Sequence, residues 1–166
     1  MIYELDLINK YVFEVCNSEL TNLDPEQESQ EYFAHAFNLN NQKVKFRIAK
    51  ITPKKIGQFV SIWKRDKNGI TKPHDLNDEF AYCIIAVRKE RKLGVFIFDK
   101  TILIEKKILA SKTAPGKRGI RVYPTWDLTE SKHAEKTQLW QSEYFVEISN
   151  ENKIDIAKAK KLLNLN

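Results

Sequence analysis

The run Glu79-Phe-Ala-Tyr-Cys-Ile-Ile-Ala-Val-Arg88 is the most apolar stretch of the chain and indicates how the chain folds. A short run rich in aliphatic and aromatic residues, without polar alternation, is typical of a strand that is buried on both faces. Such a strand lies in the middle of a sheet, so other strands must flank it and further elements must cover its two faces.

Shorter strands and helices are predicted on both sides of this run. Apolar residues at helical spacing mark the two ends of the chain, and alternating or short apolar runs mark strands between them. Together they predict an α+β fold: a single domain over residues 1–166, with a mostly antiparallel mixed sheet flanked by N- and C-terminal helices. The expected elements are helices over 2–17, 26–31, 129–141 and 153–165; a hairpin of strands 32–39 and 43–48 across Asn40-Asn41; strands over 59–64, 94–98, 101–104, 120–123 and 144–148; and loops over 54–57 and 112–119.

The composition is that of a globular protein and excludes several classes. Of the 166 residues, 42% are hydrophobic and 30% are charged. No apolar run approaches the roughly 18–20 residues of a membrane helix, so no membrane partner is expected. The start, Met1–Asp6, is acidic, unlike a secretory or mitochondrial leader. Two cysteines, Cys16 and Cys83, form neither a disulfide framework nor a cysteine zinc site, so we expect a protein of the reducing cytoplasm. The sequence indicates no oligomeric state.

The net charge of +6 is unevenly distributed along the chain. Residues 1–31 sum to −7, residues 43–72 to +9, and residues 73–166 to +4. Charge asymmetry of this kind favours an anionic partner such as a nucleic acid or a phosphorylated ligand. A solvated, lysine-rich surface that only maintains solubility is the alternative interpretation.

The basic block begins with a strictly alternating strand over residues 43–48. Its apolar residues face one side, and Lys43, Lys45 and Arg47 face the other, which predicts an exposed row of positive charge. Lys50 has the same parity as the apolar residues. If the strand continues, Lys50 points inward and needs a carboxylate or a ligand anion; if the strand has ended, Lys50 is an ordinary loop lysine.

Two further stretches combine basic residues with aromatic ones. Trp63 beside Arg65 makes either a stacking surface next to a phosphate clamp or part of the core. The glycine-flanked segment 116–127 lets the backbone approach a ligand, and the glutamines of the helix after it can contact base edges. The candidate phosphate- or nucleic-acid-binding residues are Arg47, Lys50, Lys54, Lys55, Trp63, Lys64, Arg65, Lys117, Arg118, Arg121, Tyr123, Trp126, Lys136, Gln138 and Gln141.

Three of these stretches resemble the signature of the MepB family. They are the run from Lys50 to Val60 followed by Trp63-Lys64-Arg65, the segment from Gly116 to Asp127, and the segment from Lys136 to Phe145. With Glu28-Ser29-x-x-Tyr32, the resemblance covers about residues 26–147. It implies a small cytoplasmic bacterial protein, often encoded beside drug-efflux genes. It also implies a restriction-endonuclease-like fold and recognition of nucleic acid or phosphorylated nucleosides.

Nucleases of that fold need an acidic residue followed by an Asp/Glu-x-Lys pair that holds Mg²⁺. Ile48-Ala49-Lys50 supplies the lysine without the carboxylate, and Glu105-Lys106-Lys107 with Asp78 matches the pattern in a chain where charged residues are common. Glu28 and Glu31 could supply carboxylates opposite Lys50, which makes these three the catalytic candidates. The three histidines lack metal-ligand spacing, so we expect no metal site and no cofactor, with Mg²⁺ required only by a nuclease.

The sequence leaves three hypotheses for the function. The favoured one is binding of DNA, RNA or a phosphorylated nucleoside by the basic and aromatic residues. The alternative is a metal-dependent nuclease or nucleotide phosphoester hydrolase. The third is a protein-interaction module in which the acidic N-terminal segment docks on the basic one.

Overall fold

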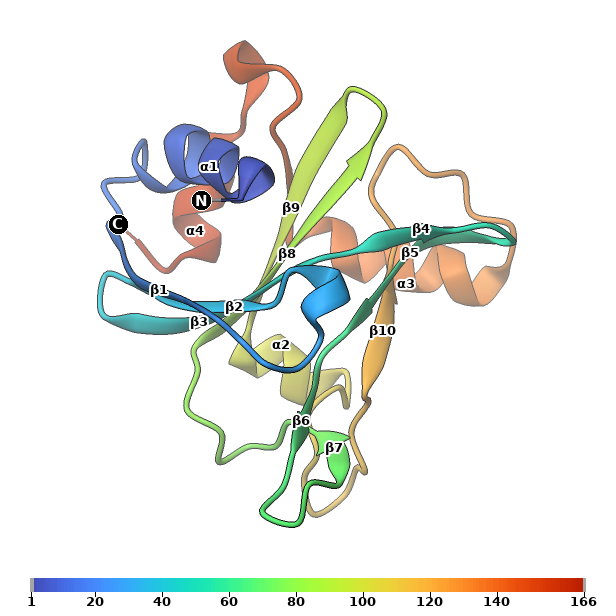
Figure 1. Cartoon of the computed structure of the whole chain (residues 1–166). Helices are drawn as coiled ribbons and strands as arrows, with labels where there is room; N and C mark the ends of the chain where they lie inside the picture. The colour runs from blue at the N-terminus through green and yellow to red at the C-terminus, as the bar shows by residue number, and fades with distance from the viewer. Residues whose placement is uncertain (1, 166) are drawn as a thin grey trace.

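A six-stranded sheet forms the centre of the computed structural model, which describes residues 2–165 (Figure 1). Met1 and Asn166, the ends of the expected domain, lie outside the described residues. The parallel pairing of β3 with β8 makes the sheet mixed, while its other neighbouring pairs are antiparallel. The strands in spatial order are β1 (Leu20–Pro25), β2 (His35–Leu39), β3 (Gln42–Ile48), β8 (Tyr82–Lys89), β9 (Lys92–Asp99) and β11 (Phe145–Glu147).

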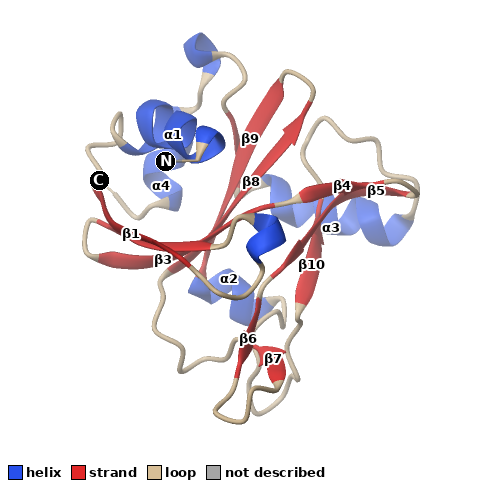
Figure 2. Ribbon diagram, viewed as in Figure 1, coloured by secondary structure: helices blue, strands red, loops and turns tan. Residues whose placement is uncertain are grey.

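Two smaller sheets and the helices surround the large sheet (Figure 2). The three-stranded sheet has the order β10 (Gly119–Val122), β5 (Lys55–Ser61), β4 (Lys50–Thr52), and the two-stranded one pairs β6 (Trp63–Arg65) with β7 (Thr71–Pro73). The helical elements are α1 (Tyr3–Ile8), η1 (Asn9–Phe13), η2 (Gln30–Tyr32), α2 (Lys100–Glu105), α3 (Lys132–Ser142), η3 (Glu151–Lys153) and α4 (Ile156–Leu162).

The apolar run from Glu79 to Arg88 contains the central strand β8, as expected. Its alternate side chains enter two different cores, because successive residues of a strand face opposite sides of a sheet. Tyr82, Ile84 and Ala86 pack with α1, η1 and α4. Ile85 and Val87 pack with β5, β10 and α2. The large sheet is therefore covered on both faces, and the second cover carries most of the basic block.

The predicted hairpin across Asn40-Asn41 is confirmed. Both asparagines have positive φ, +48° and +67°, which is the backbone geometry of a two-residue type I′ turn. Asparagine tolerates this left-handed region better than most residues, so the turn fixes the register of β2 on β3.

The strand expected over residues 101–104 is wrong, because this segment is the helix α2. The Asp99 side chain accepts a hydrogen bond from the backbone N–H of Ile102 and caps the helix. Ile102 and Leu103 are then buried while Ile104 is exposed, a helical pattern of burial. Capping and packing thus override the strand propensity of a Thr-Ile-Leu-Ile run.

The N-terminal helix is present but changes its geometry part of the way along. Its second half, η1, is a π-helix, with the N–H of Glu14 bonded to the carbonyl of Asn9 five residues earlier. The wider turn rotates the following residues. Phe13 and Cys16 are consequently buried, and the apolar side chain of Val15 is exposed.

Other boundaries differ by a few residues from the sequence expectations. Only residues 30–32 of the expected acidic helix are helical, as η2. Residues 55–57 of the expected loop belong to β5. The helix expected from residue 129 begins at Lys132, and Ser131 caps it by accepting from the N–H of Ala134. Within the described residues, no helix is long and apolar enough to cross a membrane.

Candidate anion-binding site

A cavity of about 450 Å³ lies beside β10, the edge strand of the three-stranded sheet. The start of β5, the segment after α2, the glycine-flanked loop before β10, and one side of α3 all contribute to its wall. On α3, His133, Thr137 and Trp140 line the cavity at spacings of four and three residues, so they share one helix face.

The cavity wall is strongly cationic. Lys55, Lys106, Lys117 and Arg121 line it together with His133. None of the described residues that line this cavity is an aspartate or a glutamate. Cations without neighbouring carboxylates produce a positive potential inside a concave site, so the cavity is suited to an anion.

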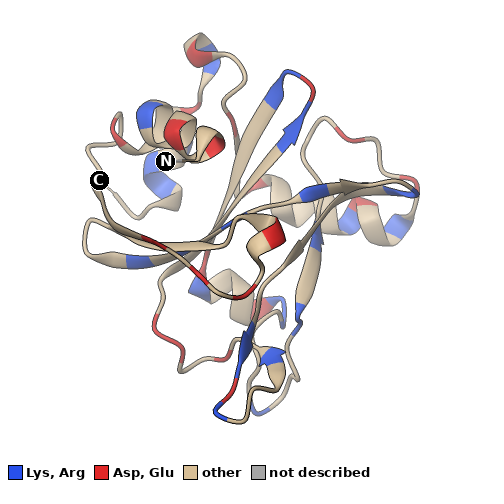
Figure 3. Ribbon diagram, viewed as in Figure 1, with Lys and Arg blue, Asp and Glu red and all other residues tan. Residues whose placement is uncertain are grey.

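Figure 3 shows the surrounding charge distribution. Acidic residues lie along α1, β1 and η2, whereas lysines and arginines mark the β4–β5 hairpin, β6 and the ends of β10. The charge asymmetry of the sequence is therefore also an asymmetry in space, although several of these cations are neutralised locally, as described below.

Two glycines shape the aromatic part of the cavity. A Cβ on Gly119 would lie 2.5 Å from the ring atom Cζ of Phe59, so only glycine lets this ring cover the strand. Gly57 has a φ of +84°, and a Cβ there would lie 2.7 Å from the Tyr123 ring. Phe59 and Tyr123 line the cavity with Trp140. The site therefore offers flat apolar surfaces beside its cations.

Arg121 is held in place by the β4–β5 hairpin. Its Nη1 donates to Thr52 Oγ1 at 3.0 Å and to the backbone carbonyls of Gly57 at 3.2 Å and Ile56 at 3.3 Å. These bonds fix one nitrogen of a planar guanidinium that has further donors, so Arg121 can hold an anion with its remaining nitrogens.

Trp140 pairs with a lysine that the sequence predictions did not include. The Lys106 Nζ lies 5.3 Å from the centre of the Trp140 ring, within cation–π range. Lys106, His133, Thr137 and Trp140 are all additional to the predicted site residues. The helical spacing of the last three was visible in the sequence, but the position of Lys106 depends on α2, which was expected to be a strand.

Gln138 and Gln141 hold backbone groups rather than present their amides to a ligand. Gln141 is buried; its Oε1 accepts from the N–H of Tyr123 at 2.8 Å and its Nε2 donates to the carbonyl of Arg121 at 3.1 Å. Gln138 Nε2 donates to two loop carbonyls, those of Pro124 and Asp127. These amides were expected to contact base edges. Instead, their hydrogen bonds attach α3 to β10 and to the loop that follows it.

Of the row of cations expected to be exposed on β3, Lys43 is exposed, but the expectation is wrong for the half-buried Lys45 and the buried Arg47, because the three-stranded sheet and the segment before η2 cover this face. Arg47 is 1% exposed, and its Nη1 lies 2.6 Å from Glu26 Oε2. Lys45 pairs with the same carboxylate, and Lys43 with Glu79 at the surface. Burial opposes ionisation of Glu26, but Arg47 and Lys45 outweigh it and lower its pKa.

Lys50 is exposed on β4, so the inward orientation considered for it is wrong. Its Nζ lies 5.1 Å from the centre of the Tyr32 ring. It does not line the cationic cavity, and neither do the two other catalytic candidates, the half-buried Glu28 and the exposed Glu31. The three candidates therefore do not join the cavity cations in one site.

The Trp63-Lys64-Arg65 group forms β6, away from the cavity lining. Lys64 Nζ lies 2.6 Å from Asp78 and 3.0 Å from Asp75. Burial alone would lower the pKa of Lys64, but the hydrogen bonds to these carboxylates outweigh it and raise the pKa. The Cζ atom of Arg65 lies 5.0 Å from the centre of the Trp63 ring, within cation–π range, so these two side chains contact each other.

The remaining predicted residues lie around the cavity or farther from it. Lys54, Arg118 and Lys136 are exposed outside its lining, and Arg118 donates to the carbonyl of Thr71. Trp126 packs edge-to-face on Phe145 in the second core. Of the fifteen predicted binding residues, those that converge on the cavity are Lys55, Lys117, Arg121, Tyr123 and Gln141.

The acidic residues of the nuclease pattern, Asp78 and Glu105, do not form a shared site. Glu105 ends α2 instead of lying on a strand, and Asp78 bonds Lys64 and His74. Among residues 2–165, no group of three His, Cys, Asp or Glu side chains is arranged to hold a metal ion.

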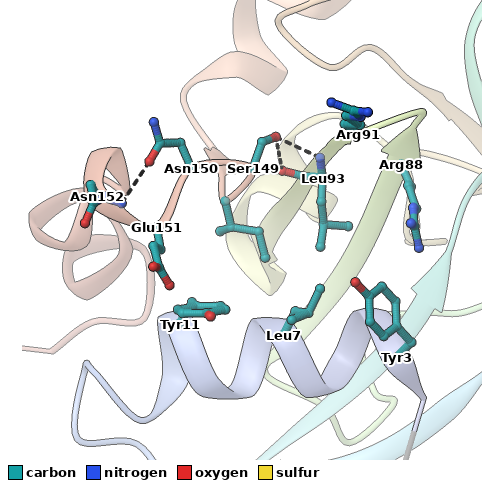
Figure 4. Close-up of a pocket in the computed structure, with 11 residues that line it drawn as sticks. Tyr3, Leu7, Tyr11, Arg88, Arg91, Leu93, Ser149, Asn150, Glu151 and Asn152 are labelled. Carbon is teal, nitrogen blue, oxygen red and sulfur yellow. Dashed lines mark hydrogen bonds between the residues drawn. The ribbon is translucent and has the colours of Figure 1, made fainter.

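A larger cavity, about 540 Å³, lies between α1 and the β8–β9 hairpin (Figure 4). Tyr3, Tyr11, Arg88, Arg91 and Glu151 contribute to its lining. Arg88 lies over the Tyr3 ring and 3.4 Å from a carboxylate of α1. Carboxylates lie beside these arginines: Glu151 in the lining and Glu4 paired with Arg88. Unlike the first cavity, this one is therefore not uniformly cationic.

Comparison with known proteins identifies a family model and a solved structure that are similar to this chain. A family model described as MepB-like matches residues 26–147. The crystal structure of MepB superposes with a TM-score of 0.79 and 35% sequence identity, covering 90% of this chain and 99% of the MepB chain. A search of curated proteins finds no match.

Proposed function

This chain belongs to the MepB-like family, and we propose that it binds a phosphorylated nucleoside in the cationic cavity beside β10. The observation that carries the proposal is the lining itself: four lysine or arginine side chains, a histidine and three aromatic rings, without a carboxylate among the described lining residues. Phosphate is recognised by such cations, and the base and sugar of a nucleotide by flat apolar surfaces.

The size of the cavity favours a nucleotide over a polymer. Sites for small ligands have volumes of roughly 300–1,000 Å³, and this one has about 450 Å³. A polymer site instead needs a basic groove that follows the backbone over several nucleotides. Here Arg47 and Lys64 are neutralised by carboxylates, which interrupts the basic surface beyond the cavity.

The proposal is binding without a metal or another cofactor, at a cytoplasmic location. The cations of the cavity can neutralise a phosphate group themselves, whereas Mg²⁺ sites in proteins rely on carboxylates. The nuclease or phosphoester hydrolase stays the alternative, and its catalytic candidates Glu28, Glu31 and Lys50 lie outside the cavity lining.

Calorimetric titration with adenosine, its 5′-monophosphate and its 3′-monophosphate tests the proposal. The monophosphates should bind and adenosine should bind at least tenfold more weakly, because charge-assisted hydrogen bonds contribute about 1.5–3 kcal/mol each. The double variant Lys55→Ala/Lys117→Ala should weaken monophosphate binding at least tenfold. The matched control Lys54→Ala/Lys112→Ala removes equal charge from neighbours outside the lining and should change it less than about threefold.

Two results would contradict the proposal. A single-stranded dodecanucleotide that binds far more tightly than any mononucleotide, with an affinity that falls steeply with salt, would indicate a polymer site. Product formation from nucleotides or strands in Mg²⁺ or Mn²⁺, lost in Lys50→Ala, would indicate the hydrolase.

A further inference from the structure

The four cations of the cavity are arranged as two pairs at its opposite ends. The first pair lies at the β4–β5 hairpin, where Lys55 begins β5 and the Arg121 guanidinium bonds the carbonyls of Ile56 and Gly57. The Tyr123 ring packs against Gly57 at this end. The hairpin end therefore combines two cations with one aromatic ring.

The second pair lies at the other end of β10. The backbone N–H of Lys117 donates to the carbonyl of Ile108 at 2.9 Å, which places Lys117 beside the segment that follows α2. That segment also carries Lys106, whose Nζ lies over the Trp140 ring. This end likewise combines two cations with one aromatic ring.

The segment from Lys117 to Arg121 limits the separation of the two pairs. β10 begins at Gly119 and the chain bends at residue 118 just before it, so four residues at about 3.3 Å each place the Cα atoms of Lys117 and Arg121 at most about 13 Å apart. Gly119 lies midway, with the Phe59 ring over it. Between the cationic ends the lining is thus uncharged and flat, and a Cβ at Gly119 would collide with the Phe59 ring.

The backbone of β10 adds donors between the two ends. Ile62 N–H donates to the carbonyl of Arg118, so residues 118, 120 and 122 bond β5, and residues 119, 121 and 123 face the open edge. Gln141 confirms this orientation by bonding the carbonyl of Arg121 and the N–H of Tyr123 from that side. The N–H groups of Gly119 and Arg121 therefore point to the edge that borders the cavity.

We propose that the ligand is a nucleoside bisphosphate, with one phosphate on each side of its sugar. The inference rests on the proposed function and deepens it. One phosphate lies between Lys55 and Arg121, the other between Lys106 and Lys117, and the nucleoside lies over Phe59 and Gly119. A nucleotide with phosphate on one side only occupies one cation pair and leaves the other without a counter-ion.

Calorimetric titration with adenosine 5′-monophosphate, 3′-monophosphate and 3′,5′-bisphosphate tests this arrangement. The bisphosphate should bind at least tenfold more tightly than either monophosphate, since it makes a second set of charge-assisted hydrogen bonds, each typically worth about tenfold or more. Lys55→Ala and Lys117→Ala should each weaken bisphosphate binding about tenfold. For a given monophosphate, only one of the two variants should have this effect.

The matched control is Arg91→Ala, which removes an exposed cation from the second cavity (Figure 4) and should leave all three affinities within about twofold. A 5′-phosphorylated hexanucleotide distinguishes a free nucleotide from the end of a strand and should bind more weakly than the bisphosphate. Tighter binding of the hexanucleotide by tenfold or more would overturn the inference.

The same titrations separate this inference from the proposed function. If a monophosphate and the bisphosphate bind equally well, or both variants weaken the same monophosphate equally, the two-ended arrangement is wrong while nucleotide binding stands. If none of the three nucleotides binds, the proposed function itself is wrong.

Discussion

Replacing Glu26 by glutamine leaves the Arg47 guanidinium buried without a counter-charge. The amide of the new side chain would keep the shape of the carboxylate and one acceptor oxygen, but neither Arg47 nor Lys45 would retain an anionic partner. Arg47 is 1% exposed and is further held by the carbonyls of Phe46 and Ser61, so it cannot turn to solvent without breaking those bonds.

The expected loss is about 3 kcal/mol of unfolding free energy at neutral pH. Removing one partner of a buried ion pair costs roughly 3–5 kcal/mol because an uncompensated charge stays buried. The lower end applies here, since the side chains of Glu26 and Lys45 keep 15% and 24% of their exposure and admit some solvent screening.

The loss should also depend on pH. The pKa of Glu26 is lowered on folding from its ordinary value of 4.5, because Arg47 and Lys45 outweigh the effect of burial. A lowered carboxyl pKa stabilises the folded state fully above the unfolded-state pKa, and this contribution is lost as the pH falls through the folded-state pKa. The difference between wild type and Glu26→Gln should therefore be largest near neutral pH and narrow below about pH 4.5.

Urea titrations monitored by circular dichroism, repeated from neutral to acidic pH, measure both effects. The control is Glu28→Gln, the same substitution two residues away on a half-buried side chain, which should change the unfolding free energy by less than about 1 kcal/mol. A Glu26→Gln protein within about 1 kcal/mol of wild type, with an unchanged pH profile, would refute the role assigned to the pair.

Three further substitutions test the packing around the cavity by the same urea titration. Gln141→Leu should cost about 2 kcal/mol, because two backbone groups of β10 and its following residue lose their hydrogen bonds; an unchanged stability would contradict this attachment. Asp99→Ala should cost about 1 kcal/mol by removing the cap of α2, and its effect should vanish if α2 is stabilised by packing alone. Gly57→Ala should cost more than Gly69→Ala, since both have positive φ but only Gly57 would bring a Cβ against the Tyr123 ring.

The parts of the fold that depend on neighbouring residues were predictable from the sequence. The hairpin across Asn40-Asn41 follows from turn chemistry, and the apolar run of β8 identifies the central strand. The helix over 101–104 was missed because the run has strand propensity. Its cap at Asp99 is a neighbouring residue, but the burial of Leu103 depends on the rest of the fold. The alternation of polar and apolar residues in β3 correctly placed Arg47 on the face opposite Val44 and Phe46. It could not show that the three-stranded sheet covers that face.

The candidate site was predictable one residue at a time but not as a group. Lys55, Lys117 and Arg121 were singled out by charge and by the glycines beside them. Their convergence comes from the pairing of β5 with β10, strands separated by about 60 residues, which no local pattern encodes. Lys106 joins them only because α2 is a helix.

The parallel pairing of β3 with β8 has a consequence for the order in which the molecule folds. These neighbours are joined through residues 49–81, which leave the large sheet, form β4 to β7, and return. Closing so long a loop costs entropy before any contact across it forms, whereas the β2–β3 and β8–β9 hairpins close short loops. We expect the two hairpins to form early and the cavity, which also awaits β10 and α3, to form late. Ligand binding should therefore recover later during refolding than the two hairpins form.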